Sequence, residues 1–519
     1  MRKIIQAAIL AFAIATVACH EDQGNYDYIS LEEIEIDTAG MEILSAYSIY
    51  RYDTLRLAPV VYLDGKRVET DPLLEQKIDY HWSIYKATTA AGVTSVVDTI
   101  GKNAMLDAII TQPAGTWIIL FTVTLKDTGI KAFMKFSLQI DEIVSDGWMV
   151  LYEREGDTDV GLIVNDRVKK GVIQERLLLD IYSASNEGQR LPGKPVSIIH
   201  SIAPLSSGEV LVASERDLVA VEKTSFGRYY DMERLFWMPP ATRALSYVGG
   251  NYTRREVVIN NNRIHYVNYM SSGLFRVDAF GSACLGEYGQ LAPWLSSFYS
   301  ASFEAIAYDQ TNKRFLCVTA AGVSVDTLNS KDKTAFDVNN VGMEMVLSDY
   351  GRSNYEFTLA RNGSEYALLV SNFYTTNINS DKIAIAKYDM SDCPGIAAVS
   401  SIAPGGLGEF IYYASGQNLH VFKYNVTGSD RVQVAWSAPA GETITCARLQ
   451  RSYYPTFALA GFLINNYAVI YIATWNETIQ SGSVYQMVVD PSNAVIDNTS
   501  RREYTGFGKV KEMSWKWTL

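Results

Sequence analysis

The sequence predicts an all-β protein in which a small immunoglobulin-like β-sandwich precedes a large β-propeller. Short strand patterns separated by turn residues are dense in residues 30–142. From residue 147 onward the chain repeats one motif, which is an apolar strand, a tight polar turn and a second apolar strand. In addition, one nine-residue stretch has an echo 200 residues later, which indicates a genuine internal repeat.

The first residues have the pattern of an export signal. Arg2 and Lys3 precede an apolar run at residues 4–17, and Ala18 then leads into Cys19. A run of 14 residues is too short to span a bilayer, which takes roughly 20, but it suits the core of a signal peptide. The pattern resembles a bacterial lipoprotein signal, which implies lipidation of Cys19. An uncleaved apolar anchor is the alternative.

The stretch after Cys19 is predicted to be a tether. We assign residues 1–18 to the signal peptide and residues 19–29 to a lipidated acidic tether. The acidic stretch that begins at His20 resembles the tag that directs lipoproteins of Bacteroidetes to the cell exterior. A merely solvated tether is the alternative. The predicted location is therefore the outer membrane, through a lipid anchor and facing outward.

Charge argues against nucleic acid as a partner. Without Arg2 and Lys3 the chain has 43 basic and 57 acidic residues, a net charge of about −14. Such a field repels phosphate backbones, and no basic stripe opposes it.

Cysteine usage predicts a fold held together by its core. Beyond Cys19 there are Cys284, Cys317, Cys393 and Cys446, and none has a metal-ligand spacing. An exported location permits a disulfide bond, so the sequence leaves the state of these thiols open.

Residues 30–142 are predicted to form the sandwich. About seven strand patterns in about 110 residues is a density typical of an immunoglobulin-like fold. Trp82, within "YHWSI", is predicted to pack between the two sheets. Because side chains alternate along a strand, His81 is predicted to point the other way.

Residues 143–519 are predicted to form the propeller. Seven strand-pair units recur at a spacing of about 53 residues, beginning at Gly147, Gly208, Arg255, Lys313, Tyr355, Gly408 and Tyr467. Repeats of this length made of short strands are typical of propeller blades. Seven blades are preferred, and six or eight are the alternatives.

Two further features bear on the ring. "SIAPLSSGE" at Ser201–Glu209 recurs as "SIAPGGLGE" at Ser401–Glu409, and both lead into a strand that ends in Ala-Ser. The C-terminal "KVKEMSWKWTL" alternates apolar and polar residues, so we expect it to close the ring, because an open ring leaves unpaired strand edges.

No catalytic or metal-binding motif is present. The chain lacks HExxH, GxSxG, P-loop and GxGxxG motifs, and four scattered histidines, His81, His200, His265 and His420, do not predict a metal site. We therefore predict no catalytic residue, no metal and no cofactor, and a protein that is not an enzyme. A hydrolase with a pair of carboxylates stays open as an alternative, since glycoside hydrolysis needs only two acids.

Aromatic residues in predicted loops are the candidate binding residues. Exposed aromatic rings are costly unless they pack or bind a ligand, and such rings can stack on sugars or clamp a peptide. Arg234, Arg243 and Asp381 lie nearby in sequence and are expected to supply polar contacts. The alternative is that these rings pack the loops against the propeller. The candidates are Tyr229, Tyr230, Trp237, Trp294, Tyr299, Phe373, Tyr374, Tyr453 and Tyr454.

Three stretches resemble the PKD-like lipoproteins of Bacteroidetes. These are "GNYDY" at residues 24–28, the "YHWSI" strand, and "PAGTWIILFTVTLKD" at residues 113–127, in which a Pro-Gly turn leads into an aromatic strand that ends in an acid. The resemblance covers about the first 140 residues. A tryptophan where tyrosine is commoner and an unusually apolar "WIILF" interior depart from the pattern.

The resemblance implies a function in nutrient uptake. PKD-like lipoproteins resemble accessory components of SusC/SusD-type systems, so the implied partners are a SusC-like TonB-dependent transporter and a SusD-like lipoprotein. The implied ligand is an oligopeptide or an oligosaccharide, with a slight preference for peptides that comes from the family. The alternative is a purely structural assembly subunit of the importer.

Overall fold

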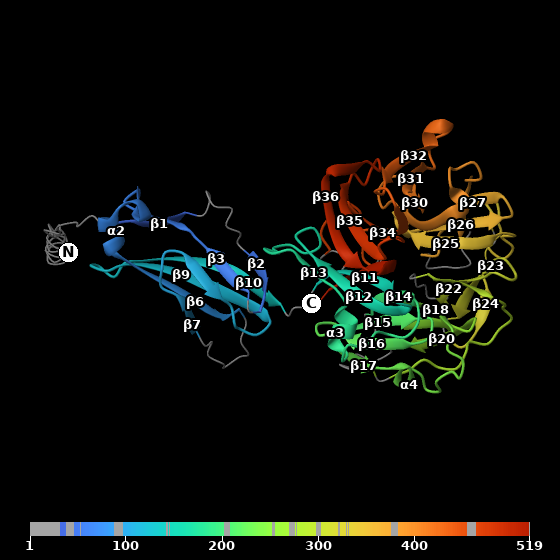
Figure 1. The fold of residues 1–519 in the computed structure, drawn as a ribbon, viewed down its shortest axis with the longest axis horizontal. Helices are drawn as coiled ribbons and strands as arrows, with labels where there is room; N and C mark the ends of the chain where they lie inside the picture. The colour runs from blue at the N-terminus through green and yellow to red at the C-terminus, as the bar shows by residue number, and fades with distance from the viewer. Residues whose placement is uncertain are drawn as a thin grey trace, which may run out of the picture.

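The protein is all-β and consists of a sandwich next to a seven-bladed propeller (Figure 1). The computed structural model describes residues 32–37, 46–51, 53–87, 97–141, 144, 146–201, 208–251, 255–268, 276, 278–296, 303–319, 322–328, 330, 332–374, 382–453 and 463–517. The predicted signal peptide, Cys19 and the tether up to residue 29 lie outside these residues. Within them, no helix has the length and apolar character needed to cross a membrane.

The sandwich is built from a five-stranded sheet and two smaller sheets. The large sheet has the order β2-β10-β9-β6-β7, and the smaller sheets are β1-β4-β5 and β3-β8. A short helix, α2 (Pro72–Gln76), is capped by Asp71, whose carboxylate accepts a hydrogen bond from the Leu73 amide. The strands are β1 (Ile34–Asp37), β2 (Ala46–Tyr50), β3 (Thr54–Leu57), β4 (Val60–Leu63), β5 (Lys66–Arg67), β6 (Ile78–Lys86), β7 (Val97–Gly101), β8 (Leu106–Ile109), β9 (Gly115–Leu125) and β10 (Lys131–Asp141).

Trp82 lies at the centre of the sandwich core, as predicted. Its side chain is fully buried and stacks on Phe121 with 4.1 Å between ring centroids. The indole N–H donates to the Asn103 carbonyl at 2.9 Å, so the one polar atom of the ring is satisfied. His81 points the other way, where its Nε2 lies 2.9 Å from the Thr99 hydroxyl. Both expectations for this strand are confirmed.

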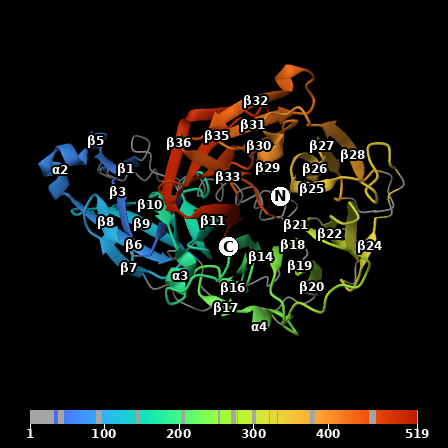
Figure 2. The same cartoon turned by 45° about the vertical axis from the view of Figure 1, so that its right-hand side comes forward.

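Seven sheets form the propeller, and Figure 2 shows them arranged around a centre. Blade 1 is β37 (Lys509–Lys516), β11 (Gly147–Arg154), β12 (Asp157–Val164) and β13 (Arg176–Leu178). Blade 2 is β14 (Pro195–Ser201), β15 (Glu209–Ser214), β16 (Leu218–Glu222) and β17 (Arg228–Tyr230). Blade 3 is β18 (Leu245–Asn251), β19 (Arg255–Asn260) and β20 (Arg263–Asn268), and blade 4 is β21 (Leu291–Leu295), β22 (Phe303–Asp309), β23 (Arg314–Thr319) and β24 (Val325–Thr327).

The remaining blades follow the same order. Blade 5 is β25 (Glu344–Tyr350), β26 (Glu356–Asn362), β27 (Glu365–Ser371) and β28 (Ala384–Asp389), and blade 6 is β29 (Val399–Pro404), β30 (Phe410–Ser415), β31 (Asn418–Lys423) and β32 (Val432–Ser437). Blade 7 is β33 (Glu442–Leu449), β34 (Val469–Asn476), β35 (Ser481–Val489) and β36 (Ile496–Phe507). Short helices α3 (Ile181–Ser185) and α4 (Met232–Leu235) lie in the connections that follow blade 1 and blade 2.

The inner strands form a closed ring. Each contacts the next in the order β14, β18, β21, β25, β29, β33 and β37, and β37 returns to β14. The C-terminal strand β37 closes the ring by pairing antiparallel with β11, with Trp515 opposite Trp148. The predicted seven blades and the predicted closing strand are therefore confirmed.

The sequence repeat matches the blades, except that one strand pair and the nine-residue echo are offset relative to the blade strands. Six of the seven predicted strand pairs are the second and third strands of a blade, whereas the pair that begins at Lys313 is the third and fourth strands, β23 and β24. The nine-residue echo falls in blades 2 and 6, but its first strand is out of register by four residues. Ser197, and not Ser201, is the counterpart of Ser401, because each hydroxyl both donates to and accepts from the inner strand of the following blade.

The sandwich contacts blade 1 through paired charges and backbone. Asp141 pairs with Lys169, and Asp53 pairs with Arg176. The Arg176 guanidinium lies 4.0 Å from the centre of the Tyr50 ring. These contacts place the sandwich against the outer part of blade 1 (Figure 1).

Candidate functional site

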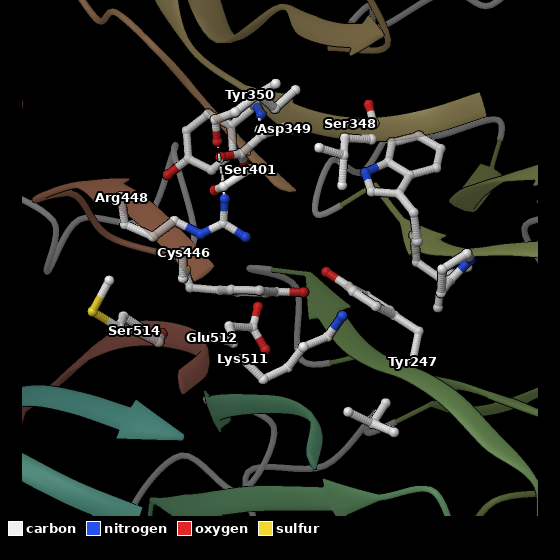
Figure 3. Close-up of a pocket in the computed structure, with 18 of the residues that line it drawn as sticks. Tyr247, Ser348, Asp349, Tyr350, Ser401, Cys446, Arg448, Lys511, Glu512 and Ser514 are labelled. Carbon is white, nitrogen blue, oxygen red and sulfur yellow. Dashed lines mark hydrogen bonds and ion pairs between the residues drawn. The ribbon is translucent and has the colours of Figure 1, made fainter. Parts of the chain in front are cut away.

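The inner strands of the propeller enclose a central cavity of about 180 Å³. Every one of the seven inner strands contributes lining residues, so the cavity lies on the axis of the ring. Figure 3 shows side chains from several blades converging on it. The charged lining residues are Asp349, Glu356, Arg448, Arg451, Lys511 and Glu512.

Asp349 is the centre of an ionic cluster on one side of the cavity. The carboxylate pairs with Arg451 and lies 3.3 Å from Nη1 of Arg448. The Arg451 guanidinium also lies 3.6 Å from the centre of the Tyr350 ring and donates to the Tyr350 carbonyl. Although burial favours the neutral form, the charge of Asp349 raises the pKa of Arg451. These groups are thus held in fixed positions by one another.

The other two carboxylates are also held by donors. Oε2 of Glu512 accepts from the Ile198 amide at 2.9 Å, and burial raises the pKa of Glu512 against the opposing charge of Arg448. Burial and the nearby charge of Asp349 raise the pKa of Glu356 to about 8. Glu356 is therefore mostly protonated at neutral pH.

Lys511 differs from the other charged lining residues. It is exposed, and Figure 3 shows its ammonium group reaching toward Tyr247. In the part of the chain that the structure describes, Lys511 makes no hydrogen bond and no ion pair. Its ammonium group therefore faces the cavity without a hydrogen-bonded partner in this part of the chain, and its charge acts at longer range on the Glu512 carboxylate.

Two tyrosines narrow the cavity near Lys511. Burial, with the neighbouring Tyr453, raises the pKa of Tyr247 well above its ordinary value, so its hydroxyl stays protonated. A Cβ at Gly249 would lie 2.9 Å from the Tyr453 hydroxyl oxygen. Glycine at this position therefore lets Tyr453 approach β18 closely.

Of the aromatic candidates, Trp294 and Tyr453 line the central cavity. Tyr229, Trp237 and Tyr374 lie on the outer surface, with exposed fractions of 44%, 67% and 41%. The candidates therefore do not gather at one site.

Other candidates are unavailable or lie outside the described residues. The prediction that Phe373 binds a ligand is wrong. Its ring is buried in a core cluster, with its centroid 5.1 Å from that of Phe315, which leaves no face for a ligand. Tyr230 is half-buried and lies 6.2 Å from Tyr229. Tyr299 and Tyr454 lie outside the described residues.

The polar contacts expected near the aromatic loops are only partly described. Arg243 pairs with Glu233 and lies 3.4 Å from Asp217, so it supports its own loop. Asp381 lies outside the described residues.

Sequence reasoning missed the charged lining residues of the central cavity. Five of the six stand on or just after an inner strand, as in "VLSDY" for Asp349 and "KVKEMSW" for Lys511, and Glu356 begins the second strand of blade 5. A charge inside a predicted strand was a usable signal. Only the ring closure reveals that these strands share one axis.

Buried glutamates recur on the second strands of the blades, and one of them, Glu356, also lines the central cavity. Glutamates stand at the first or second position of the second strand in blades 2 to 5, and all four are buried: Glu209, Glu256, Glu304 and Glu356. Arg276 bridges the first two, with Nη2 2.9 Å from Oε2 of Glu209 and Nη1 2.8 Å from Oε2 of Glu256.

The described ranges contain no candidate metal site, and their cysteines are buried. They hold no group of three or more histidine, cysteine or acidic side chains arranged to hold a metal. The four described cysteines are buried and unbridged, and burial raises the pKa of the Cys446 thiol in the cavity wall.

Comparison with known proteins supports the sandwich region most directly. The profile of the PKD-like family matches residues 19–195, which span the tether, the sandwich and the start of the propeller. No curated protein matches the chain.

Solved structures resemble the fold at low identity. A quinoprotein alcohol dehydrogenase-like protein from Bacteroides thetaiotaomicron is 13% identical, with 94% of this chain and 100% of that chain covered and a TM-score of 0.40. The WD40 domain of SCAP from fission yeast is 8% identical, with 61% and 74% covered and a TM-score of 0.36. The β-propeller domain of Cps50 (Swd1) from Myceliophteria thermophila is 7% identical, with 55% and 93% covered and a TM-score of 0.28.

Proposed function

We propose that this protein is a surface lipoprotein of the outer membrane that assists a SusC/SusD-type nutrient importer by holding substrate in its propeller. The observation that carries the proposal is the central cavity, which all seven inner strands line and in which charges held by one another lie beside Lys511, a cation that makes no ion pair among the described residues. A small cavity with a few convergent polar groups is the usual form of a binding site.

The anchoring part of the proposal rests on the N-terminal sequence. The apolar run and Cys19 fit a lipoprotein signal, and the PKD-like match begins at Cys19. A lipid group with several acyl chains anchors a protein stably without a spanning helix. The sandwich then stands between the tether and the propeller in the chain.

The state of the carboxylates favours binding over catalysis. Asp349 is engaged by two arginines, and Glu512 accepts a backbone hydrogen bond. A general base needs a carboxylate that can reach the substrate proton. These two acids are instead used to hold the cavity wall, so the proposed protein is not an enzyme.

A hydrolase is the second candidate because of one observation. Burial and the nearby charge of Asp349 raise the pKa of Glu356 to about 8, and a carboxyl group that keeps its proton at neutral pH can serve as a general acid. Glu356→Gln separates the two candidates. Loss of a hydrolytic activity of the purified protein would favour the hydrolase, whereas unchanged ligand binding without any activity favours the binding protein.

A purely structural role in the importer is the third candidate. It would gain support if the exposed aromatic residues shared one flat face. Tyr229 is on the outer strand β17 of blade 2, Trp237 is in the connection that follows this blade, and Tyr374 is in a connection of blade 5.

The test is purification of the tagged lipoprotein from outer membranes in mild detergent, followed by mass spectrometry. Recovery of a TonB-dependent barrel and its SusD-like lipoprotein, with peptides or sugars attached, is the expected result. A Cys19→Ala variant is the matched control, since it removes the lipid anchor without touching the propeller. Recovery of the lipoprotein alone from the same membranes would refute the importer role.

A further inference from the structure

The central cavity is lined by hydrogen-bond donors that have no partner among the described residues. Besides Lys511, two lining donors have no acceptor in the described residues, the Trp148 indole N–H and the Ser246 hydroxyl. Trp148 is 1% exposed, so no bulk water satisfies its N–H. A buried donor without a partner costs free energy, which a ligand that accepts hydrogen bonds would recover.

The acidic groups of the cavity do not fill this need. Asp349 is occupied by Arg448 and Arg451, and Glu512 by the Ile198 amide. Glu356 is 2% exposed, and its Oε2 accepts a hydrogen bond from the Ser348 hydroxyl at 3.5 Å. The lining holds three cations, Arg448, Arg451 and Lys511, and the two arginines are engaged by Asp349.

We propose that the cavity binds the carboxylate of its ligand and that Lys511 is the residue that pairs with it. This rests on the proposed function and adds the chemical class of the ligand. A carboxylate offers several acceptor sites, which suits an ammonium group and convergent neutral donors. Tyr247, toward which Lys511 reaches, adds a hydroxyl at this end of the cavity that is hydrogen-bonded to Tyr453.

Two kinds of nutrient carry such a carboxylate, a peptide with a free C-terminus and an acidic sugar. The cavity of about 180 Å³ has room for a terminal residue or one sugar ring and not for a whole oligomer. The rest of the ligand then extends out of the cavity. The same anchoring chemistry serves both sources, and matched ligands distinguish them.

The experiment is isothermal titration calorimetry on the full-length lipoprotein in mild detergent. The peptide pair is acetyl-trialanine as the free acid and as the C-terminal amide, and the sugar pair is digalacturonate and neutral galactobiose. We expect one acidic member to bind about 10- to 100-fold more tightly than its neutral partner, the effect of one charge-assisted hydrogen bond. The pair that shows the difference identifies the source.

Variants of β37 test whether Lys511 pairs with the carboxylate of the ligand. Lys511→Met is expected to reduce affinity for the acidic ligand to that of the neutral one, and Lys511→Arg to retain most of it. Lys509→Met is the matched control, because Lys509 is an exposed lysine on the same strand that does not line the cavity. Thermal unfolding of each variant verifies its fold.

Three results would overturn the proposal: equal affinity for both members of each pair, unchanged affinity of the Lys511→Met variant, or no binding of any acidic ligand. These results are independent of the importer test. Copurification of a transporter together with a negative titration removes the carboxylate site alone, and a positive titration without copurification removes the importer role alone.

Discussion

The sandwich and the propeller bury their strands in different ways. In the sandwich, each sheet has one face in the core, and β10 alternates between more exposed and more buried residues along much of its length. In the propeller, both faces of a blade pack on neighbouring blades, and all six residues of β15 are buried. One of the buried residues of β15 is charged, Glu209. The sandwich core, in contrast, consists of apolar side chains around Trp82.

This difference separates two sources of specificity. An apolar core tolerates changes that keep volume and pattern, and its stability follows the area buried. A buried charge needs its partner in place, so it fixes how one blade meets the next. We expect the two parts to respond differently to four changes.

Removal of residues 508–519 is expected to have the largest effect. It deletes β37, so β11 loses its partner and the apolar face around Trp148 is exposed at an open edge. The propeller should lose its cooperative unfolding transition in differential scanning calorimetry, while a transition for the sandwich remains. A shortened chain that keeps both transitions would show that the ring does not depend on this strand.

Trp82→Ala is expected to affect the sandwich alone. Replacing a buried tryptophan with alanine costs about 3–5 kcal/mol, because the core loses contacts and a cavity remains. Denaturant unfolding followed by a probe in each part should show the sandwich transition shifted and the propeller transition unchanged. A matching shift of the propeller transition would mean that the two parts unfold as one unit.

Arg276→Met is the corresponding change in the propeller. It leaves Glu209 and Glu256 buried without their cation, and we expect a cost of about 3 kcal/mol, since methionine refills part of the volume. The loss should shrink as the pH falls toward 5, because burial raises the pKa of Glu209, and an acid with a raised pKa in the folded state destabilises most at high pH, where it is ionised.

Chemical denaturation at pH 5 and pH 8 measures this effect. The triple variant with Glu209→Gln and Glu256→Gln is the control, and it should recover stability at pH 8. A cost that is independent of pH would assign the loss to packing instead of charge.

The fold could be predicted from the sequence more completely than the site, for a physical reason. The alternation around Trp82 and the seven strand pairs are local patterns, so they could be read from adjacent residues. The central cavity joins residues that are far apart in sequence, such as Tyr247, Asp349 and Lys511, and only closure of the ring brings them together. Exposed aromatic loops were a weaker guide, since Phe373 packs in the core.

Lys516→Met is expected to give the smallest of the four effects. Lys516 is buried, in contrast to the exposed Lys511 on the same strand. Its Nζ is buried and donates to the carbonyls of Val144 and Lys223 at 3.1 and 2.7 Å. Burial lowers the pKa of Lys516 to about 7, against the pull of Asp146.

In the unfolded chain this lysine titrates near pH 10.4, so between pH 7 and 10 the unfolded state binds a proton that the folded state does not. Stability should therefore rise with pH in this window, by about 2 kcal/mol from pH 7 to pH 9 relative to the Lys516→Met variant. Chemical denaturation of both proteins at the two pH values measures the difference. Lys509→Met is the matched control on the same strand and should follow the wild-type pH profile, because its side chain is exposed. Equal slopes for wild type and Lys516→Met would mean that the two carbonyls keep Lys516 charged at pH 9, and ring closure would then rest on a buried ammonium held by backbone acceptors alone.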